Sequence, residues 1–360
     1  MNRKTKVIVN VLLLILALLI HVFSLNKHWV EKYYAQLFYP EIASFLRAIT
    51  ALLPFSVGDI LYGGVIGWMI YKLWRLFVII YRKQFSRQLF KSVMISAGLK
   101  LLWVYIIFNL FWGLNYNRVG IAQQIGIVVK PYSNQDLLSL NQLLLDSANQ
   151  KKLNWISEGR PSLNNKALFT AAKEAYTVAQ KSYPFLKYPH PSVKSSIWGW
   201  VGNYAGFMGY YNPFSGEAQL NTTIPRFLLP FTTCHEIGHQ LGYAKENEAN
   251  FVGFLAASAS SRSDFQYSVY LDLFLYANRN LYRVDSVAAR SFSKQLHPEV
   301  KADLKAWQKF NDKHQNPFEP IIRWAYGKYL QNNQQPSGMM SYDEVTAFMI
   351  AYYKHLAKLK

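Results

Sequence analysis

Two histidines and a glutamate share one turn of a predicted helix, at His235, Glu236 and His239. Residues four apart lie on the same helix face, so both imidazoles can aim a nitrogen at one ion about 2 Å away. Glu236 then lies beside that ion, and the spacing predicts a zinc site. Zinc lowers the pKa of a bound water towards neutrality, so we expect Glu236 to accept the proton as general base and return it to the leaving amine.

Two histidines do not complete such a site, because a catalytic zinc takes a third protein ligand and keeps its fourth position for water. Gly242 follows the motif, and glycine readily adopts the left-handed conformation that ends a helix and turns the chain back. A second helix that begins near Glu246 can then return a carboxylate to the metal. Glu246 is favoured as the third ligand and Glu248 is the alternative. Asn250 shares a helix face with Glu246 and is expected to orient a histidine.

Cys234 is the only cysteine of the chain, which excludes an internal disulfide framework and Cys-rich zinc modules. Its side chain points about 100° round the helix from His235, which favours a small buried residue over a fourth ligand. Two other interpretations stay open. The histidines can make ordinary hydrogen bonds, or the metal site can be structural or regulatory without turnover. A structural site is usually closed by four protein ligands, whereas three are offered here.

The segment before the motif is rich in aromatic residues, glycine and asparagine, which is typical of strands and turns. Residues 214–221 are predicted to form an edge strand beside the motif helix, and an equal alternative is a buried or hairpin strand. An edge strand can pair with an extended peptide through main-chain hydrogen bonds. The expected substrate-binding residues are Gly216, Glu217 and Ala218. Three later tyrosines are candidate donors to a substrate oxyanion, although core positions suit them better: Tyr267, Tyr270 and Tyr276.

The motif helix, the turn and the following Glu246-Asn247-Glu248-Ala249-Asn250 resemble the zincin metallopeptidases whose third ligand is a glutamate in a Glu-x-x-Ala-Asp/Asn helix. This resemblance implies a zincin-like domain with Glu246 as the third zinc ligand. More broadly, the chain is similar to a bacterial family of three-pass membrane proteins of unassigned function. That similarity rests on five segments: residues 112–116, 209–214, 216–218, 235–251 and 341–342.

Most of the secondary structure predicted around these residues is helical. Residues 133–150 and 164–182 each open with a capping residue and carry apolar side chains at helical spacing. Pro230 suits the first turn of the motif helix, and Ser341 to Glu344 have the spacing of a capping box. We therefore predict an α+β fold, mainly α, in which residues 116–360 form one helical domain with a small sheet.

Three apolar runs lie within residues 1–115, at about 7–25, 57–80 and 92–112, and each is long enough to cross a bilayer as a helix. The first run has nineteen residues without a charge and is not followed by a small-residue cleavage site. It is therefore predicted to be an uncleaved anchor. Lys72 and Arg75 lie near one end of the second run and are expected to reach the headgroups.

Basic residues flank these runs and predict their orientation. The net charge is +19, and residues 1–120 hold 14 Lys and Arg against three acids. The basic N-terminus and residues 82–91 are both expected in the cytoplasm. Three crossings then place residues 116–360 on the extracytoplasmic side of the inner membrane. Topology thus explains the charge, and no motif indicates a nucleic-acid partner.

The leading hypothesis is a membrane-anchored zinc-dependent peptidase that acts on a peptide or protein substrate outside the cytoplasm. The alternative is a non-catalytic metal-binding membrane protein with a structural or regulatory role in the cell envelope. An intramembrane protease is disfavoured, because the motif has polar neighbours and lies more than a hundred residues after the last apolar run. No feature of the sequence indicates an oligomeric state.

Overall fold

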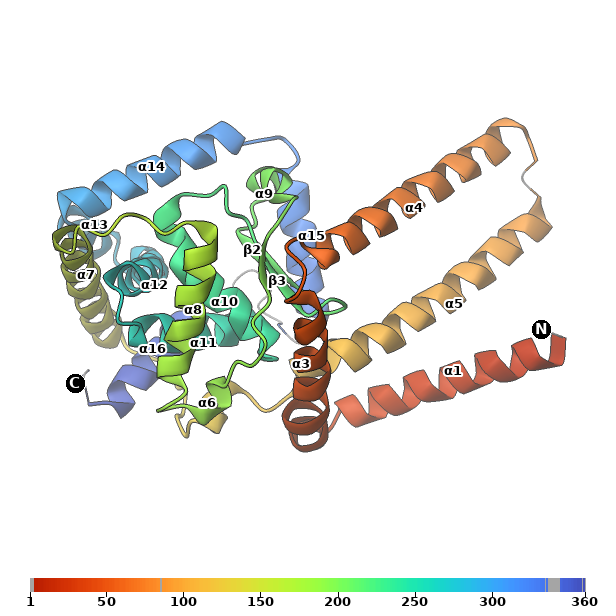
Figure 1. The fold of residues 1–360 in the computed structure, drawn as a ribbon, viewed down its shortest axis with the longest axis horizontal. Helices are drawn as coiled ribbons and strands as arrows, with labels where there is room; N and C mark the ends of the chain where they lie inside the picture. Colours follow the sequence, from red (N-terminus) through yellow and green to blue (C-terminus); the bar gives the residue numbers. More distant parts are fainter. Residues whose placement is uncertain (1–2, 85, 334, 336–343, 358, 360) are drawn as a thin grey trace.

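A computed structural model describes residues 3–84, 86–333, 335, 344–357 and 359. The fold is mostly helical (74%) with one small three-stranded sheet. Three long helices project from one side of a rounded helical domain (Figure 1). The predicted α+β architecture, mainly α, is therefore confirmed at this level.

The three projecting helices are α1 (Arg3–Ser24), α4 (Val57–Tyr81) and α5 (Arg87–Phe111). All three are long and apolar enough to cross a membrane, which indicates a membrane protein. Two of them start at serine caps, because Ser56 accepts from Asp59 N and Ser86 accepts from Leu89 N, each at 3.1 Å. The apolar runs predicted from the sequence form these helices.

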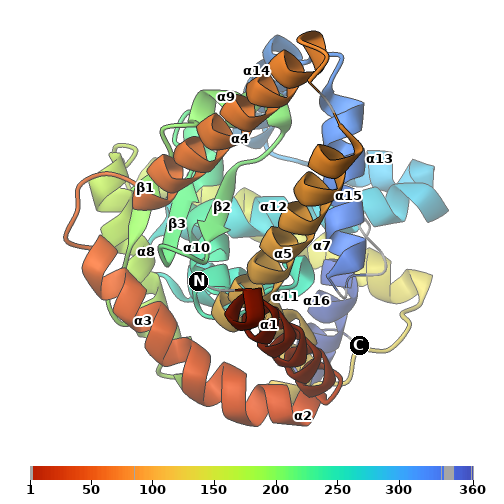
Figure 2. The same ribbon diagram turned by 90° about the vertical axis from the view of Figure 1, so that its right-hand side faces the viewer.

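Between α1 and α4 the chain forms α2 (Lys27–Trp29), the π-helical segment η1 (Val30–Phe38) and α3 (Tyr39–Thr50). This segment runs along the side of the domain from which the long helices project (Figure 2). Tyr34, Tyr39 and Trp112 are buried in a small hydrophobic cluster that joins α1, η1, α3 and the end of α5. The cluster fastens the base of the long helices to the domain.

The helical domain begins with η2 (Gly113–Asn117) and α6 (Ile121–Gln124). The predicted helices at 133–150 and 164–182 are α7 (Asn134–Ser157) and α8 (Asn165–Ala179), capped by Ser133 and Asn164. The later elements are η3 (Pro184–Leu186), α9 (Gly199–Ala205), η4 (Arg226–Leu228), α10 (Leu229–Gln240), α11 (Glu246–Ala259), α12 (Ser263–Val284), α13 (Ser286–Lys294), α14 (Pro298–His314), α15 (Glu319–Asn332) and α16 (Glu344–His355). Ser341 and its two successors in the predicted capping box lie outside the described residues.

The sheet has the order β1-β3-β2, with β1 (Val193–Ser195) parallel and β2 (Gly209–Asn212) antiparallel to β3 (Glu217–Leu220). The predicted edge strand at 214–221 is therefore wrong, because β3 is the central strand and all four of its residues are buried. The alternative of a buried strand is confirmed. β2 is the outer strand of the described sheet nearest the motif residues.

Candidate metal centre

The motif helix α10 carries His235 and His239 one turn apart, with their ring centroids 4.7 Å from each other. Pro230 lies in the first turn of the helix, as its sequence position predicts. The helix packs beneath β2 and β3 and against α11 and α12. Both histidines therefore project from a helix that is packed on several sides inside the domain.

Gly242 ends this helix and turns the chain back, as predicted. Its φ of +89° lies in the left-handed region that favours glycine. An added Cβ would lie 2.8 Å from the ring of Tyr39 and 3.1 Å from Asn115 Oδ1, so space also requires glycine here. The turn is short, and α11 begins at Glu246.

Two further glycines let α10 and α11 cross closely. A Cβ at Gly253 would lie 3.0 Å from His235 N, and a Cβ at Gly238 would lie 3.2 Å from Ala249 O. Since neither position tolerates a side chain without movement, the backbones come nearer than ordinary helices allow. This crossing places the first residue of α11 directly against the histidine face of α10.

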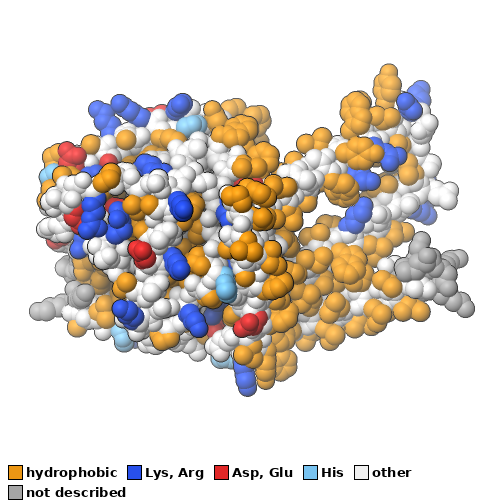
Figure 3. Space-filling model, viewed as in Figure 1, with side chains coloured by type: hydrophobic (Ala, Val, Ile, Leu, Met, Phe, Trp, Pro, Cys, Tyr) orange, Lys and Arg blue, Asp and Glu red, His pale blue; other side chains and the backbone are white. Residues whose placement is uncertain are grey.

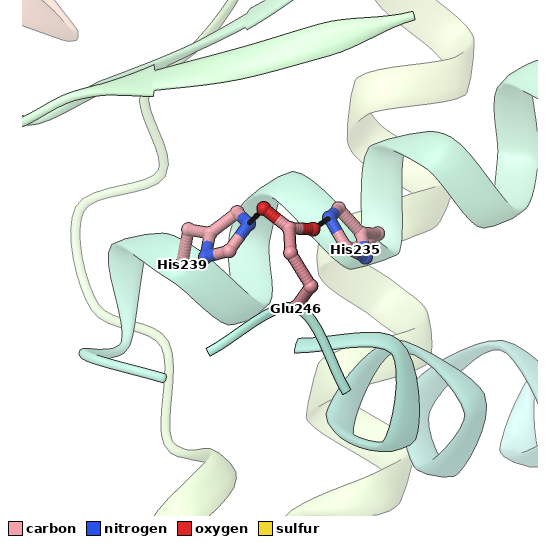
Figure 4. A group of neighbouring side chains, drawn as sticks. All are labelled: His235, His239 and Glu246. Atoms are coloured by element: carbon pink, nitrogen blue, oxygen red, sulfur yellow. Dashed lines mark ion pairs between the residues drawn. The ribbon is translucent and has the colours of Figure 1, made fainter. Parts of the chain in front are cut away.

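Glu246 lies between the two histidines, as Figure 4 shows. Its Oε2 is 3.3 Å from His235 Nε2, and its Oε1 is 3.8 Å from His239 Nε2. One ligand atom from each of the three residues lies within 4.8 Å of the others. The described residues thus contain a His, His, Glu cluster that can hold a metal ion.

The charges in this cluster shift the pKa values of its members. Burial alone would lower the pKa of His239, but the nearby carboxylate of Glu246 and the charge of Glu236 raise that pKa to about 9. Burial would raise the pKa of Glu246, yet both histidines hold it well below its usual range. The carboxylate of Glu246 is therefore ionised at neutral pH and attracts either protons on the imidazoles or a cation.

The tautomer of His239 follows from its second ring nitrogen. Nδ1 of His239 lies 2.8 Å from the carbonyl oxygen of Tyr243, and a carbonyl only accepts. Nδ1 therefore carries the proton and donates it, which leaves the Nε2 lone pair of the neutral ring directed at Glu246. A backbone carbonyl in this position is a common support for a metal-binding histidine.

His235 has a different neighbour. His235 Nδ1 and Asp272 Oδ2 are buried and have no hydrogen-bond partner among the described residues. The helices that carry them, α10 and α12, meet one turn earlier, where Phe231 N donates to Ser268 Oγ at 3.1 Å. Burial raises the pKa of Asp272 to about 7, and the charge of His235 opposes this rise. An acid therefore lies within electrostatic reach of the first histidine.

Glu236 is buried on the same helix and packs against the outer strand. A Cβ at Gly209 of β2 would lie 2.6 Å from Glu236 Oε1. Glu236 Oε2 has no hydrogen-bond partner among the described residues. Burial raises the pKa of Glu236, while the charges of His235 and His239 oppose the rise. The result is a carboxyl group with raised proton affinity beside the cluster.

The two possible third ligands are separated by the structure. Glu246 belongs to the cluster, whereas Glu248 Oε1 lies against Gly120, where a Cβ would be 2.9 Å away. Burial raises the pKa of Glu248, and the charges of Lys245 and Arg118 oppose the rise. Glu248 thus faces the start of α6 instead of the histidines. The preference for Glu246 is in agreement with this geometry.

Neither Asn250 nor Cys234 is part of the metal cluster. Asn250 Nδ2 donates to Glu246 O at 2.8 Å, one turn back in the same helix. No described contact joins Asn250 to a histidine, so its predicted role of orienting one is not supported. Tyr243 O is instead the partner of His239 Nδ1, and Asp272 is within electrostatic reach of His235. Cys234 is fully buried and is not part of the cluster, as expected.

The three residues expected to bind substrate support the fold instead. Glu217 accepts from Val57 N at 3.1 Å and from Gly58 N at 2.6 Å, at the start of α4. Ala218 N donates to Ser192 O, and its strand is paired on both sides. Gly216 has a φ of +70° and would meet Leu46 at 2.9 Å if it carried a Cβ. The expectation of an open peptide-binding edge at Gly216, Glu217 and Ala218 is therefore wrong, because a central strand has no free edge.

A family model matches residues 34–350, which is most of the chain. The chain belongs to this family, which is described as protein of unknown function (DUF3810). Neither the comparison with curated proteins nor the comparison with solved structures gave a match. The matched range contains α4, α5 and all three residues of the cluster.

Sequence reasoning missed one side chain at the cluster. Tyr326 of α15 donates its hydroxyl to Glu246 Oε1 at 2.8 Å, across 80 positions of sequence. The tyrosines considered from the sequence lie elsewhere: Tyr267 donates to Asp303 in the core, and Tyr270 and Tyr276 pack against that core. Tyr326 carries no local motif, so only the folded chain brings it to the cluster.

Proposed function

We propose that this protein is a membrane-anchored zinc-dependent peptidase of zincin type, with His235, His239 and Glu246 as the zinc ligands. The observation that carries the proposal is the position of one carboxylate between two imidazoles, with a second carboxylate beside them. Two nitrogens and one oxygen form a donor set that suits catalytic zinc. The fixed tautomer of His239 supports this fit, because its Nε2 lone pair is directed into the cluster.

A zinc ion held by these residues would supply a polarised water and a Lewis acid for the scissile carbonyl. Glu236 is suited to accept the proton of that water, because burial already raises its affinity for protons. Glu236 then returns the proton to the leaving amine. The Tyr326 hydroxyl, which lies beside Glu246 Oε1, is suited to donate to the substrate oxyanion.

The substrate is proposed to be a peptide or protein that binds along β2. This strand is the outer one of the described sheet on the side of Glu236, because Gly209 packs directly against that side chain. An extended chain can add to an outer strand through main-chain hydrogen bonds. We thus assign to β2 the pairing with an extended peptide that the sequence suggested for β3.

We place the domain on the extracytoplasmic side of the inner membrane. The first turn of α1 and the adjoining ends of α4 and α5 are both at the end of the long helices that is far from the domain (Figure 1). Both regions are rich in Lys and Arg, which favour the cytoplasmic side. The metal cluster is on α10 and α11, which are not among the membrane-length helices of the described chain, and this argues against an intramembrane protease.

A non-catalytic metal site is the alternative, and the cover provided by α15 is the observation that favours it. Tyr326 bonds to Glu246, and Tyr329 bonds to Tyr116 at 3.1 Å, so α15 closes over the cluster. If α15 stays in this position, substrates are kept from the metal. A structural or regulatory role in the cell envelope would then follow.

An assay of hydrolysis distinguishes the peptidase from the non-catalytic metal site. The full-length protein in nanodiscs, with zinc present, is incubated with a fluorescence-quenched peptide library. The peptidase proposal expects turnover by the wild type and its loss in Glu236→Gln, with metal content unchanged. Metal-loaded wild type without turnover would support the non-catalytic role. Turnover that survives Glu236→Gln would show that Glu236 is not the base.

A further inference from the structure

Exposed Trp and Phe side chains outside the three long helices are confined to one side of the described structure. Four of them follow the segment between α1 and α4: Trp29, Phe38, Phe45 and Phe55. The others are Trp200 on α9 and Phe318 and Trp324 at α15. The remaining surface of the domain exposes neither residue type among the described positions.

Contacts place these three regions around the base of the long helices. Trp198, which caps α9, donates its Nε1 hydrogen to Asp59 O in the first turn of α4 at 3.1 Å. Asn316, just before α15, donates to Tyr204 O of α9 at 2.7 Å. Only residues 51–56 separate the end of α3 from the start of α4. Figures 1 and 2 show α3, α9 and α15 on the side from which the long helices project.

The side chains on this face are exposed to a degree that is unusual for aromatic residues. Phe45 and Trp324 are each 66% exposed, and Trp200 is 62% exposed. In the space-filling view, hydrophobic side chains form a band where the domain meets the long helices (Figure 3). A contiguous apolar patch of this kind marks a contact with a partner or a membrane.

The partner is identified by continuity with the membrane helices. A bilayer crossed by α1, α4 and α5 has its outer surface where these helices reach the domain. Aromatic side chains are enriched at that depth, because their rings favour the boundary between headgroups and acyl chains. A protein partner on this face would need to displace the lipid that surrounds α1, α4 and α5.

We infer that α3, α9 and α15 rest in the outer interfacial layer of the bilayer and hold the domain down on the membrane. The metal cluster then lies at the membrane surface, because the ring of His239 is 6.1 Å from that of Trp112, the residue that ends α5. α15 both touches the lipid and covers the cluster through Tyr326. The bilayer is thus the partner of this face.

This placement also selects a substrate class, a consequence that rests on the proposed peptidase function. A cluster held at the bilayer surface meets chain segments that have just left the same membrane at a high effective concentration. Membrane-anchored proteins, cut close to their anchor, are therefore the expected substrates. A free peptide of the same sequence has to find the site from solution.

Site-directed spin labelling tests the membrane contact directly. Nitroxides attached to Phe45→Cys, Trp200→Cys and Trp324→Cys are compared in nanodiscs, and the native Cys234 is buried and does not compete for the label. Val287→Cys is the matched control, because Val287 is 72% exposed on α13 at the opposite end of the domain. All four positions are exposed, so the substitutions leave the core intact.

The inference expects the three labels to collide more with oxygen and less with a water-soluble nickel complex than the label at position 287. Accessibility to nickel equal to that of the control at all three positions would overturn it. The readout needs neither metal nor activity, so its failure is distinct from failure of the peptidase proposal. For the substrate class, a cleavable sequence fused to a transmembrane anchor should be cut at least about 10-fold faster than the free peptide, and equal rates would refute that consequence.

Discussion

Replacing Gly209 by alanine tests the role of Glu236 without changing Glu236 itself. The added Cβ would lie 2.6 Å from Glu236 Oε1, 2.8 Å from Cγ and 2.9 Å from Cδ. Since carbon and oxygen atoms need roughly 3.4 Å or more, the carboxylate has to retreat by about 1 Å. The backbone of Gly209 does not require glycine, because its φ is not in the left-handed region.

Gly209→Ala is expected to slow the chemical step without lowering the stability of the fold. A misplacement of about 1 Å at a catalytic group lowers the rate by roughly 10²-fold. Alanine in a strand gains about 0.5–1 kcal/mol of stability over glycine, which offsets part of the crowding. Gly209→Ala should therefore retain its metal and its melting temperature to within a few degrees while kcat falls.

The assay is hydrolysis of a fluorescence-quenched peptide by the protein in nanodiscs, with metal content measured on the same sample. Gly64→Ala is the control, because a Cβ at Gly64 meets no atom within 4 Å. Full turnover by metal-loaded Gly209→Ala would refute the assignment of Glu236 as base in this position. Loss of metal from Gly209→Ala would instead show that β2 supports the ligands.

Asp272→Asn should weaken zinc binding by about 10-fold, because it removes an acid within electrostatic reach of His235. Competition with a chromophoric chelator measures this affinity, and an unchanged value would show that Asp272 does not act on the site. Zinc binding at pH 7 should release about one proton, because the pKa of His239 near 9 keeps that ring protonated in the metal-free protein. Affinity should therefore rise with pH up to about 9, and titration calorimetry that shows no dependence on buffer ionisation would contradict this. Glu217→Gln should destabilise the fold by about 1.5–3 kcal/mol through its charged hydrogen bonds at the start of α4; a raised KM for peptide with unchanged stability would restore Glu217 to substrate binding.

The residues of the cluster could be predicted from sequence because they are close together in the chain. Helical spacing brings His235 and His239 to one face, and Gly242 provides the reversal that returns Glu246 to them. The choice between Glu246 and Glu248 depended on a resemblance, because both acids lie in the first turn of α11. The close crossing at Gly238 and Gly253 is what makes the return possible.

The order of the strands could not be predicted in the same way. β1, β2 and β3 have three or four residues each, which is too short for alternation to distinguish a central strand from an outer one. Tyr326 was also missed, since it reaches Glu246 from a distant helix and carries no motif. The same holds for Asp272 of α12, which is within electrostatic reach of His235 but is not part of the cluster. Asn250 had the expected spacing, but its amide bonds to Glu246 O instead of a histidine.

His235, His239 and Glu246 are proposed to hold one metal ion with a position left for solvent. X-ray absorption spectroscopy at the zinc edge, on full-length protein equilibrated with zinc and dialysed, measures this most directly. We expect about one zinc per chain, bound by two imidazole nitrogens, one carboxylate oxygen and one solvent oxygen at about 2.0–2.2 Å. Glu246→Gln should lose this signal and Glu248→Gln should keep it. Absence of bound metal in the wild type, or equal spectra for the two variants, would show that these three residues do not form the proposed zinc site.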